Sequence, residues 1–387
     1  MTSSLLIAER TLHKLVEHKK PKTQSKDWVF SLQYNVQSIT NTNRPYLFSL
    51  NQTDTENELL AQNILKKIGF SSAENVKFLD SQMDFDCFKA VIEGQARYFK
   101  YSFDGDGSFF AHEYNILKQL APFSPVAYKH GKTKYGESVQ YIVTSFESAD
   151  TVAEFGLSSI FEHNDSFLYT FDKLRGVKVD RTFSHYLNDV FARYDIEQLP
   201  EHSLAAIADH TNIDNLRSIL KTLKNEVEYL SRQSFCKTSD FCHGKLIPDN
   251  ILIKNNLFKF QHLQHGYMGN QLFDLCNLFI NMGIPLEYQR QFAMDYKSLF
   301  PDFNEQQFIE EYNSCSNLML RLFVYETIFN YLCEVYLYES SRPAKILQMV
   351  SVFLRNEEAL AMIPSLSQYN TFLIRDIMEP LIGNSEQ

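Results

Sequence analysis

The chain has 387 residues, a mass of 45.1 kDa and a net charge of −10, with 37 Lys and Arg against 47 Asp and Glu. Hydrophobic residues make up 44% of it, which excludes an intrinsically disordered protein. The acidic balance argues against a dedicated nucleic-acid-binding protein, because such a protein holds phosphates with Lys and Arg. Only 13 glycines are present, so the backbone has few places to wrap closely around a phosphate.

The six cysteines and the apolar segments bear on the compartment of the protein. No two cysteines form a C-x-x-C pair and no histidines follow them at zinc-finger spacing, so we expect no structural zinc site. No apolar run reaches the roughly 20 residues that a membrane span needs. Charged residues interrupt the N-terminal stretch where a secretion signal is apolar. We therefore expect a cytoplasmic protein without a membrane partner.

Residues 1–54 predict a small extension ahead of the main unit. Apolar residues recur at helical spacing over residues 5–15, residues 28–37 alternate as in a strand, and residues 46–50 suit its hairpin partner. This extension has seven Lys and Arg against four Asp and Glu, a net charge of +3. Docking of the lysines in residues 19–26 on an acidic partner is one interpretation, and a solvated loop is the favoured one.

Residues 55–148 predict a strand-rich lobe, because short runs of β-branched and aromatic residues alternate there with turn residues. The expected elements, in chain order, are a helix over 56–68 ended by Gly69, strands over 88–92 and 96–101 joined by a Glu93-Gly94 turn within a strand-rich stretch 76–103, a helix over 109–120 before Pro122, and strands over 126–129 and 139–145 separated by a Gly/Lys turn at 131–136.

Residues 149–387 predict a larger, helix-dominated lobe. Apolar residues between Leu216 and Leu230 recur at the spacing of one helix face. Residues 318–338 are apolar nearly all round, which predicts a central helix. The whole chain is therefore expected to be an α+β protein divided into an extension and two lobes.

One segment carries the strongest functional signal, the run His243-Gly-Lys-Leu-Ile-Pro-Asp-Asn250 before a short apolar strand. It resembles the catalytic loop of the aminoglycoside phosphotransferase and choline kinase family, which reads His-Gly-Asp-Leu, three variable residues and Asn. The run from Gly269 to Leu275 resembles the family's following segment, Gly-Asp-Pro-x-x-Asp-Leu. Because these motifs match in order and spacing over residues 56–387, the resemblance implies a two-lobed protein-kinase-like fold, with the extension packed near the small lobe.

The resemblance also assigns residues to a nucleotide site. Lys100 looks like the phosphate-binding lysine of the third strand, and Glu113 looks like the glutamate of the next helix that pairs with it. Each has a plainer interpretation, Lys100 as a strand-edge lysine and the pair as a structural tie between strand and helix. His243 and Asp274 match positions that are largely architectural in the family, and Asn250 matches the loop asparagine.

Two acidic positions of the family's chemistry are replaced. The loop aspartate is Lys245, which is cationic at pH 7 and cannot act as a base unless its pKa falls by several units. The metal-binding position falls at or beside His262, and no Asp or Glu occurs from Ile251 to Phe273. Mg²⁺ prefers oxygen ligands, so imidazole is a poor substitute.

The hairpin expected to cover the phosphates over residues 79–88 departs as well. It has no glycine, and its acidic residues Asp80, Asp84 and Asp86 would repel a triphosphate if they pointed inward. Three parts of the phosphoryl-transfer machinery are thus missing together. We expect no confident catalytic residue, with His243, Lys245 and Asn250 as a degenerate loop.

Several residues keep two interpretations. Lys245 either binds an anion in the former active cleft or turns to solvent. Asp249 either replaces the lost metal ligand or, as we favour, is a turn residue after Pro248. His262 and His265 flank Gln264 and could form a transition-metal pair, but without a third ligand we expect no metal site.

We therefore expect a catalytically inactive kinase-like protein that acts by binding, as a scaffold, regulator or ligand sensor. Its partner would be an unidentified protein or a small ligand in the former cleft, with no cofactor required. The alternative is an ATP- and Mg²⁺-dependent phosphotransferase for small molecules, with Asp249, Asp240 or a hairpin carboxylate as a relocated ligand. Nucleotidyl transfer on the same fold is a third and more distant alternative.

Overall fold

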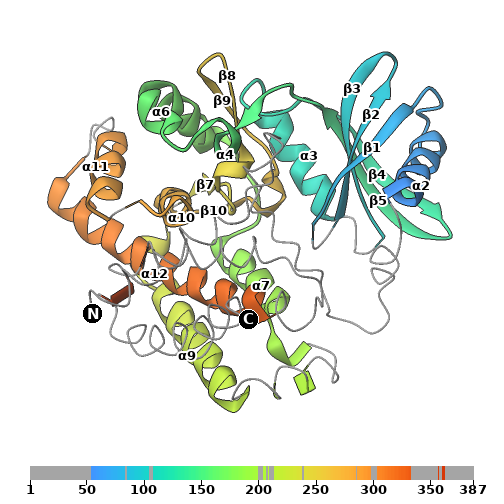
Figure 1. Ribbon diagram of the computed structural model, residues 1–387. Coiled ribbons are helices and arrows are strands. Elements are labelled where there is room, and N and C mark those ends of the chain that lie inside the picture. The colour runs from blue at the N-terminus through green and yellow to red at the C-terminus, as the bar shows by residue number, and fades with distance from the viewer. Residues whose placement is uncertain are drawn as a thin grey trace, which may run out of the picture.

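The computed structural model describes residues 54–82, 85–103, 108–198, 204–205, 208, 213–237, 239–284, 286–297, 303–332, 356 and 360–361. A strand-rich lobe is followed along the chain by a larger helical lobe, and the chain passes between them after residue 145 (Figure 1). The two-lobed α+β fold is thereby confirmed. The helix and hairpin predicted over residues 1–54 lie outside the described residues except for Asp54, and the boundaries drawn between the parts stay a prediction.

The small lobe is built on an antiparallel sheet with the strand order β1-β2-β3-β5-β4. Helix α2 packs on one face, and helix α3 lies between the other face and the large lobe (Figure 1). The Glu93-Gly94 turn forms as predicted, with φ of 52° and 73°, the left-handed conformation of a tight hairpin. The elements are α2 Asp54–Lys67, β1 Glu74–Gln82, β2 Phe85–Ile92, β3 Gln95–Ser102, α3 Ser108–Leu120, β4 Ala127–Tyr135 and β5 Glu137–Ser145.

The turn predicted at residues 131–136 is wrong, because β4 continues to Tyr135 and pairs with β5 along its length. Gly131 lies inside the strand against Tyr141, whose hydroxyl oxygen is 3.0 Å from where a Cβ would be. The glycine therefore makes room for a ring on the next strand, and only Gly136, with φ of 72°, turns the chain. The interspersed exposed lysines suit a sheet edge, where charge discourages pairing with another chain.

Short strands and helices alternate in the large lobe. As predicted, α9 buries one stripe that includes Leu216, Leu223 and Val227, and α12 is buried on most sides between Leu318 and Phe329. The elements are β6 Asp150–Thr151, α4 Val152–Phe155, α5 Ser159–Glu162, α6 Asn164–Lys173, η2 Leu174–Gly176, α7 Phe183–Arg193, η3 Ile196–Gln198, α9 Ile213–Ser231, η4 Ser234–Lys237, β7 Asp240–Cys242, η5 Pro248–Asn250, β8 Ile251–Lys254, β9 Leu257–Phe260, η6 Leu263–His265, β10 Tyr267–Gly269, α10 Leu272–Met282, α11 Leu286–Lys297 and α12 Glu305–Leu332.

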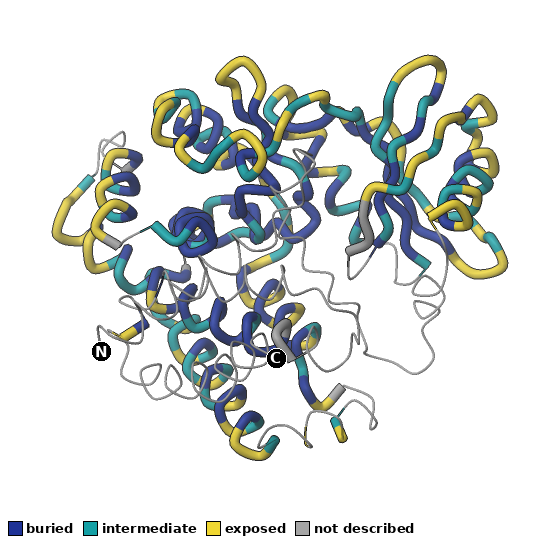
Figure 2. Tube along the Cα trace, in the orientation of Figure 1, coloured by how far each residue is buried: buried dark blue, intermediate teal, exposed yellow. Residues whose placement is uncertain are grey.

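The buried apolar side chains form two clusters. Figure 2 shows where the buried residues lie along the chain. The smaller cluster lies between α2 and one face of the small-lobe sheet and includes Ile64 and Phe88. The larger cluster fills the helical lobe and continues through α3 to the other sheet face, where it includes Leu120 and Phe85. The larger cluster is thus shared by both lobes, and the smaller one belongs to the small lobe alone. Among the described residues, no helix combines the length and apolarity that crossing a bilayer takes.

Candidate functional site

A buried ion pair joins strand β3 to helix α3. The ammonium of Lys100 lies 2.7 Å from Oε1 and 3.0 Å from Oε2 of Glu113, with side-chain exposures of only 3% and 2%. Lys100 also donates to Oε1 of Gln264 at 3.4 Å and lies 5.0 Å from the ring centre of Phe85. Burial strengthens the attraction between two such charges and fixes the lysine in one position.

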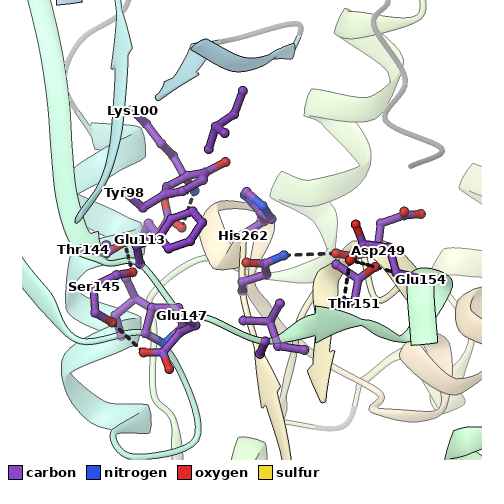
Figure 3. Close-up of a pocket in the computed structure, with 17 residues that line it drawn as sticks. Tyr98, Lys100, Glu113, Thr144, Ser145, Glu147, Thr151, Glu154, Asp249 and His262 are labelled. Atoms are coloured by element: carbon purple, nitrogen blue, oxygen red, sulfur yellow. Dashed lines mark hydrogen bonds and ion pairs between the residues drawn. The ribbon is translucent and has the colours of Figure 1, made fainter. Parts of the chain in front are cut away.

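This ion pair lies on the wall of a cavity of about 290 Å³ between the two lobes. Figure 3 shows residues of the small lobe on one side of it and residues of the large lobe on the other. The cavity brings together four of the residues singled out in the sequence, Lys100 and Glu113 from the small lobe and Asp249 and His262 from the large lobe. Asp249 is buried there, at 4% exposure.

Hydrogen bonds to Asp274 on helix α10 hold the loop that begins at His243. The backbone N–H groups of His243 and Gly244 donate to the two carboxylate oxygens of Asp274, at 2.5 and 3.1 Å. Burial raises the pKa of Asp274 to about 7, although these two donors favour its charged form. The aspartate therefore has the architectural place that the resemblance implied, beneath the loop rather than in the cleft.

His243 braces the same loop from inside. Its Nε2 lies 2.9 Å from the carbonyl oxygen of Gln261, and its Nδ1 accepts from the backbone N–H of Lys245 at 3.3 Å. Burial lowers the pKa of His243 to about 4, so the ring is neutral with its proton on Nε2. Asn250 closes the loop by donating its side-chain N–H to the carbonyl oxygen of Lys245 at 2.8 Å.

Gly244 lets this loop approach the segment that ends at His265. Its φ is +80°, and an added Cβ would be 2.3 Å from the backbone oxygen of His265. No side chain fits at that distance, so a glycine is required both for the conformation and for the contact.

Lys245 is half-buried in the loop that follows β7. Among the described residues it lines a second cavity within the large lobe, not the cleft between the lobes. It shares that cavity with Arg193, His265 and Glu326. The charge of Lys245 acts on His262 of the cleft as well as on Glu326 of helix α12, so both interpretations of this residue stay predictions.

His262 is an unusual residue of the cleft. Its backbone is left-handed, with φ of 61° and ψ of 49°, a rare conformation for a side chain of this size. It is 5% exposed, and its Nδ1 has no hydrogen-bond partner. Burial, and then the charge of Lys100, lowers its pKa well below the ordinary value, so the imidazole is neutral.

The two histidines of this segment do not converge on a metal. His262 lines the cleft, whereas His265 lines the second cavity. Over the part of the chain that the structure describes, no three His, Cys, Asp or Glu side chains are grouped for an ion.

The other carboxylates considered as relocated ligands have separate surroundings. Asp240 forms an ion pair with Arg175 at 3.5 Å, on strand β7. The side chain of Asp86 accepts a hydrogen bond from Tyr101, and the burial of that ring together with this carboxylate raises the tyrosine pKa. The side chains of Asp80 and Asp84 lie outside the described residues.

An ion pair next to the connection between the lobes was not predicted from the sequence. Glu147, just after β5, accepts from the ammonium of Lys259 on β9 at 2.8 Å and from the hydroxyl of Ser145 at 2.7 Å. Although burial favours the neutral acid, these donors lower the pKa of Glu147. Residues so far apart in sequence have no shared motif, so no pattern could have paired them.

Similar folds occur among solved structures of small-molecule kinases. A thermostable mutant of aminoglycoside phosphotransferase APH(4)-Ia in its apo form matches with a TM-score of 0.51 and 11% identity, over 77% of this chain and 99% of that chain. Choline kinase LicA from Streptococcus pneumoniae matches with a TM-score of 0.51 and 13% identity, over 78% of this chain and 99% of that one. The chain has the fold of these kinases.

Amicoumacin kinase hAmiN, solved with AMP-PNP, Ca²⁺ and Ami, matches with a TM-score of 0.50 and 12% identity, over 78% of this chain and 94% of that chain. No protein-family model and no curated protein matches the sequence. The resemblance predicted from motif order is thereby confirmed at the level of the fold.

Proposed function

We propose that this protein binds a nucleotide in the cleft between its lobes and acts through binding rather than through magnesium-dependent phosphoryl transfer. The proposal is carried by an anchored cation in the cleft, Lys100, together with the replacement of the two acidic positions of kinase chemistry by Lys245 and, at or beside the metal position, His262. Lys100 would hold the phosphates, and Glu113 would keep its ammonium in place.

The carboxylates of the cleft support the absence of a magnesium site. Of those among the described lining residues, Glu113 is bonded to Lys100. Glu147 is bonded to Lys259, and Glu154 accepts from the backbone N–H and hydroxyl of Thr151. Asp249 and the imidazole of His262 also line the cleft, and one carboxylate with one imidazole suits a transition ion better than Mg²⁺.

Calorimetric titration with ATP, with and without Mg²⁺, tests this function. We expect binding that is insensitive to Mg²⁺, and a roughly tenfold loss of affinity in Lys100→Met because a charge-assisted contact to phosphate is removed. Lys221→Met, on the exposed side of α9, is the matched control and should bind as the parent protein does. Magnesium-dependent formation of ADP that Asn250→Ala abolishes, or unchanged affinity in Lys100→Met, contradicts the proposal.

A second candidate is an ATP-dependent phosphotransferase acting on a small molecule. It is favoured by Asp249, which lines the same cavity as Lys100, and by the fold shared with phosphotransferases. In this function Asp249 would orient the acceptor or hold a metal ion. Incubation with labelled ATP and a panel of amino alcohols, sugars and aminoglycosides would then yield a phosphorylated product, and Asp249→Asn would remove it. If no compound of the panel takes up the label and the ATP stays intact, this second candidate function is rejected.

A further inference from the structure

His262 has an unpaired ring nitrogen, unlike His243, which braces the loop beside it. Both nitrogens of His243 are hydrogen-bonded, Nε2 to the carbonyl oxygen of Gln261 and Nδ1 to the backbone N–H of Lys245. The Nδ1 of His262 is buried and, among the described residues, has no hydrogen-bond partner. An unpaired polar atom in the interior is costly, so its presence calls for an explanation.

The backbone of His262 is unusual for a buried residue. Its φ of 61° is left-handed, as are those of the non-glycine residues Asn75, Glu93, Asn255 and Asn256. Those four residues are exposed, whereas His262 is only 5% exposed. A side chain persists in this conformation inside a protein when its surroundings hold it there, and such residues cluster at ligand sites.

Hydrogen bonds on both sides of His262 hold this conformation. The preceding residue, Gln261, donates its side-chain N–H to the carbonyl oxygen of Asp249 at 3.1 Å. Two residues after His262, the side-chain oxygen of Gln264 accepts from the ammonium of Lys100 at 3.4 Å. The imidazole is therefore carried by a segment that is fixed to both lobes.

The imidazole lines the cavity between the lobes, on the side of the large lobe (Figure 3). It meets the ring of Tyr98 edge to face, with centroids 5.8 Å apart, and the ammonium of Lys100 lies 5.8 Å from the centre of the same tyrosine ring. The charge of Lys100 reaches the imidazole, because after burial it is the next cause of the lowered pKa of His262. A cation and a neutral N–H donor thus adjoin one cavity, and an anionic oxygen pairs with both.

We propose that His262 donates a hydrogen bond from Nδ1 to a phosphate oxygen of the nucleotide, so that Lys100 and His262 hold the phosphates from the two lobes without an intervening ion. This contact rests on the proposed nucleotide binding and takes the place of the metal. Nδ1 is covered in the ligand-free protein, and a turn of the ring about its Cβ–Cγ bond, a torsion with a broad range in histidine, would present it to the cavity. Because this nitrogen has already lost its water, the new hydrogen bond adds no desolvation cost on its side.

Calorimetric titration of the full chain with ATP in EDTA, beside the same titration with adenosine, tests this contact. His262→Leu removes the donor and should weaken ATP binding roughly tenfold while leaving adenosine binding unchanged, since adenosine has no phosphate. His262→Asn is the matched control and should stay within about twofold of the parent protein for both ligands, because asparagine tolerates a left-handed backbone and has an amide N–H at the same distance from the backbone as Nδ1. If the leucine variant fails to fold, His262→Gly removes the donor while relieving the backbone.

Three outcomes overturn the contact. An unchanged affinity for ATP in His262→Leu or His262→Gly, or an equal loss for ATP and adenosine, does so while a weakened Lys100→Met leaves the nucleotide site standing. Tighter ATP binding on addition of Mn²⁺ or Zn²⁺ that His262→Leu abolishes makes the ring an ion ligand instead of a phosphate donor. Absence of ATP binding by the parent protein rejects the nucleotide site and the contact together.

Discussion

The backbone of Gly244 meets the backbone of His265 more closely than any side chain allows. Replacing Gly244 with alanine should therefore destabilise the protein by at least about 3 kcal/mol, because left-handed strain and a clash with a carbonyl oxygen add together. Gly94→Ala is the matched control, since φ there is +73° but nothing lies within 4 Å of the added Cβ. That variant should lose only about 1 kcal/mol.

Urea unfolding of both variants measures the difference. A similar loss in the free energy of unfolding for Gly244→Ala and Gly94→Ala would mean that the loop moves to accommodate the added methyl group. The close contact beneath the loop would then contribute little to its position.

The neutral state of His243 makes stability depend on pH. Its pKa falls from the ordinary 6.5 to about 4 in the folded protein because the ring is buried. The unfolded chain therefore binds more protons between these values, and the stability present above pH 6.5 is lost as the pH falls towards 4. The loss from this residue is about 3 kcal/mol. Asp274 acts in the opposite direction, since its raised pKa favours the folded state as the pH falls below about 7.

Comparison with His243→Gln separates the two effects, because the glutamine amide can still donate to Gln261 but does not titrate. The free energy of unfolding of the parent protein should fall relative to that of the variant between pH 6.5 and 4.5, measured by denaturant titration at each pH. Parallel pH profiles would show that the imidazole titrates in the folded protein as it does in the unfolded chain.

Motifs revealed part of the site and geometry supplied the rest. Lys100, Glu113 and Asp274 could be predicted because they stand in short motifs whose order along the chain resembles that of a known family. The surroundings of Lys245 could not, since they depend on the packing of α12. Arg193 and Glu326 carry no motif, and their proximity to Lys245 follows from the folded arrangement of three separate elements.

At the scale of elements, amphipathic helices were predictable and one strand was not. The stripe of α9 is a local pattern whose period identifies the helix and its buried face. The extent of β4 depends on its partner strand. Gly131 alone predicts a turn, and only its contact with Tyr141 on β5 explains a glycine inside the strand. The η5 turn at residues 248–250 follows the expected proline rule, with Pro248 at its start.

The whole molecule should unfold in one cooperative transition. The larger apolar core runs from the helical lobe through α3 to the small-lobe sheet, so neither lobe can lose its packing alone. Leu120→Ala in this core and Ile64→Ala in the smaller core should each cost about 2–5 kcal/mol. Calorimetry should show both variants lowering the temperature of the same single transition.

Two resolved transitions, each shifted by one of these variants, would show that the lobes are energetically separate.

The shared core also has a consequence for synthesis on the ribosome. The small lobe emerges first, yet helix α3 packs against residues that follow far later, in η6 and at Gly266. At roughly 5–20 residues per second, this face of α3 waits about 7–30 s for these partners. The nascent chain is therefore exposed to aggregation, and to chaperones that bind apolar surface, for much of the time taken to make its helical half.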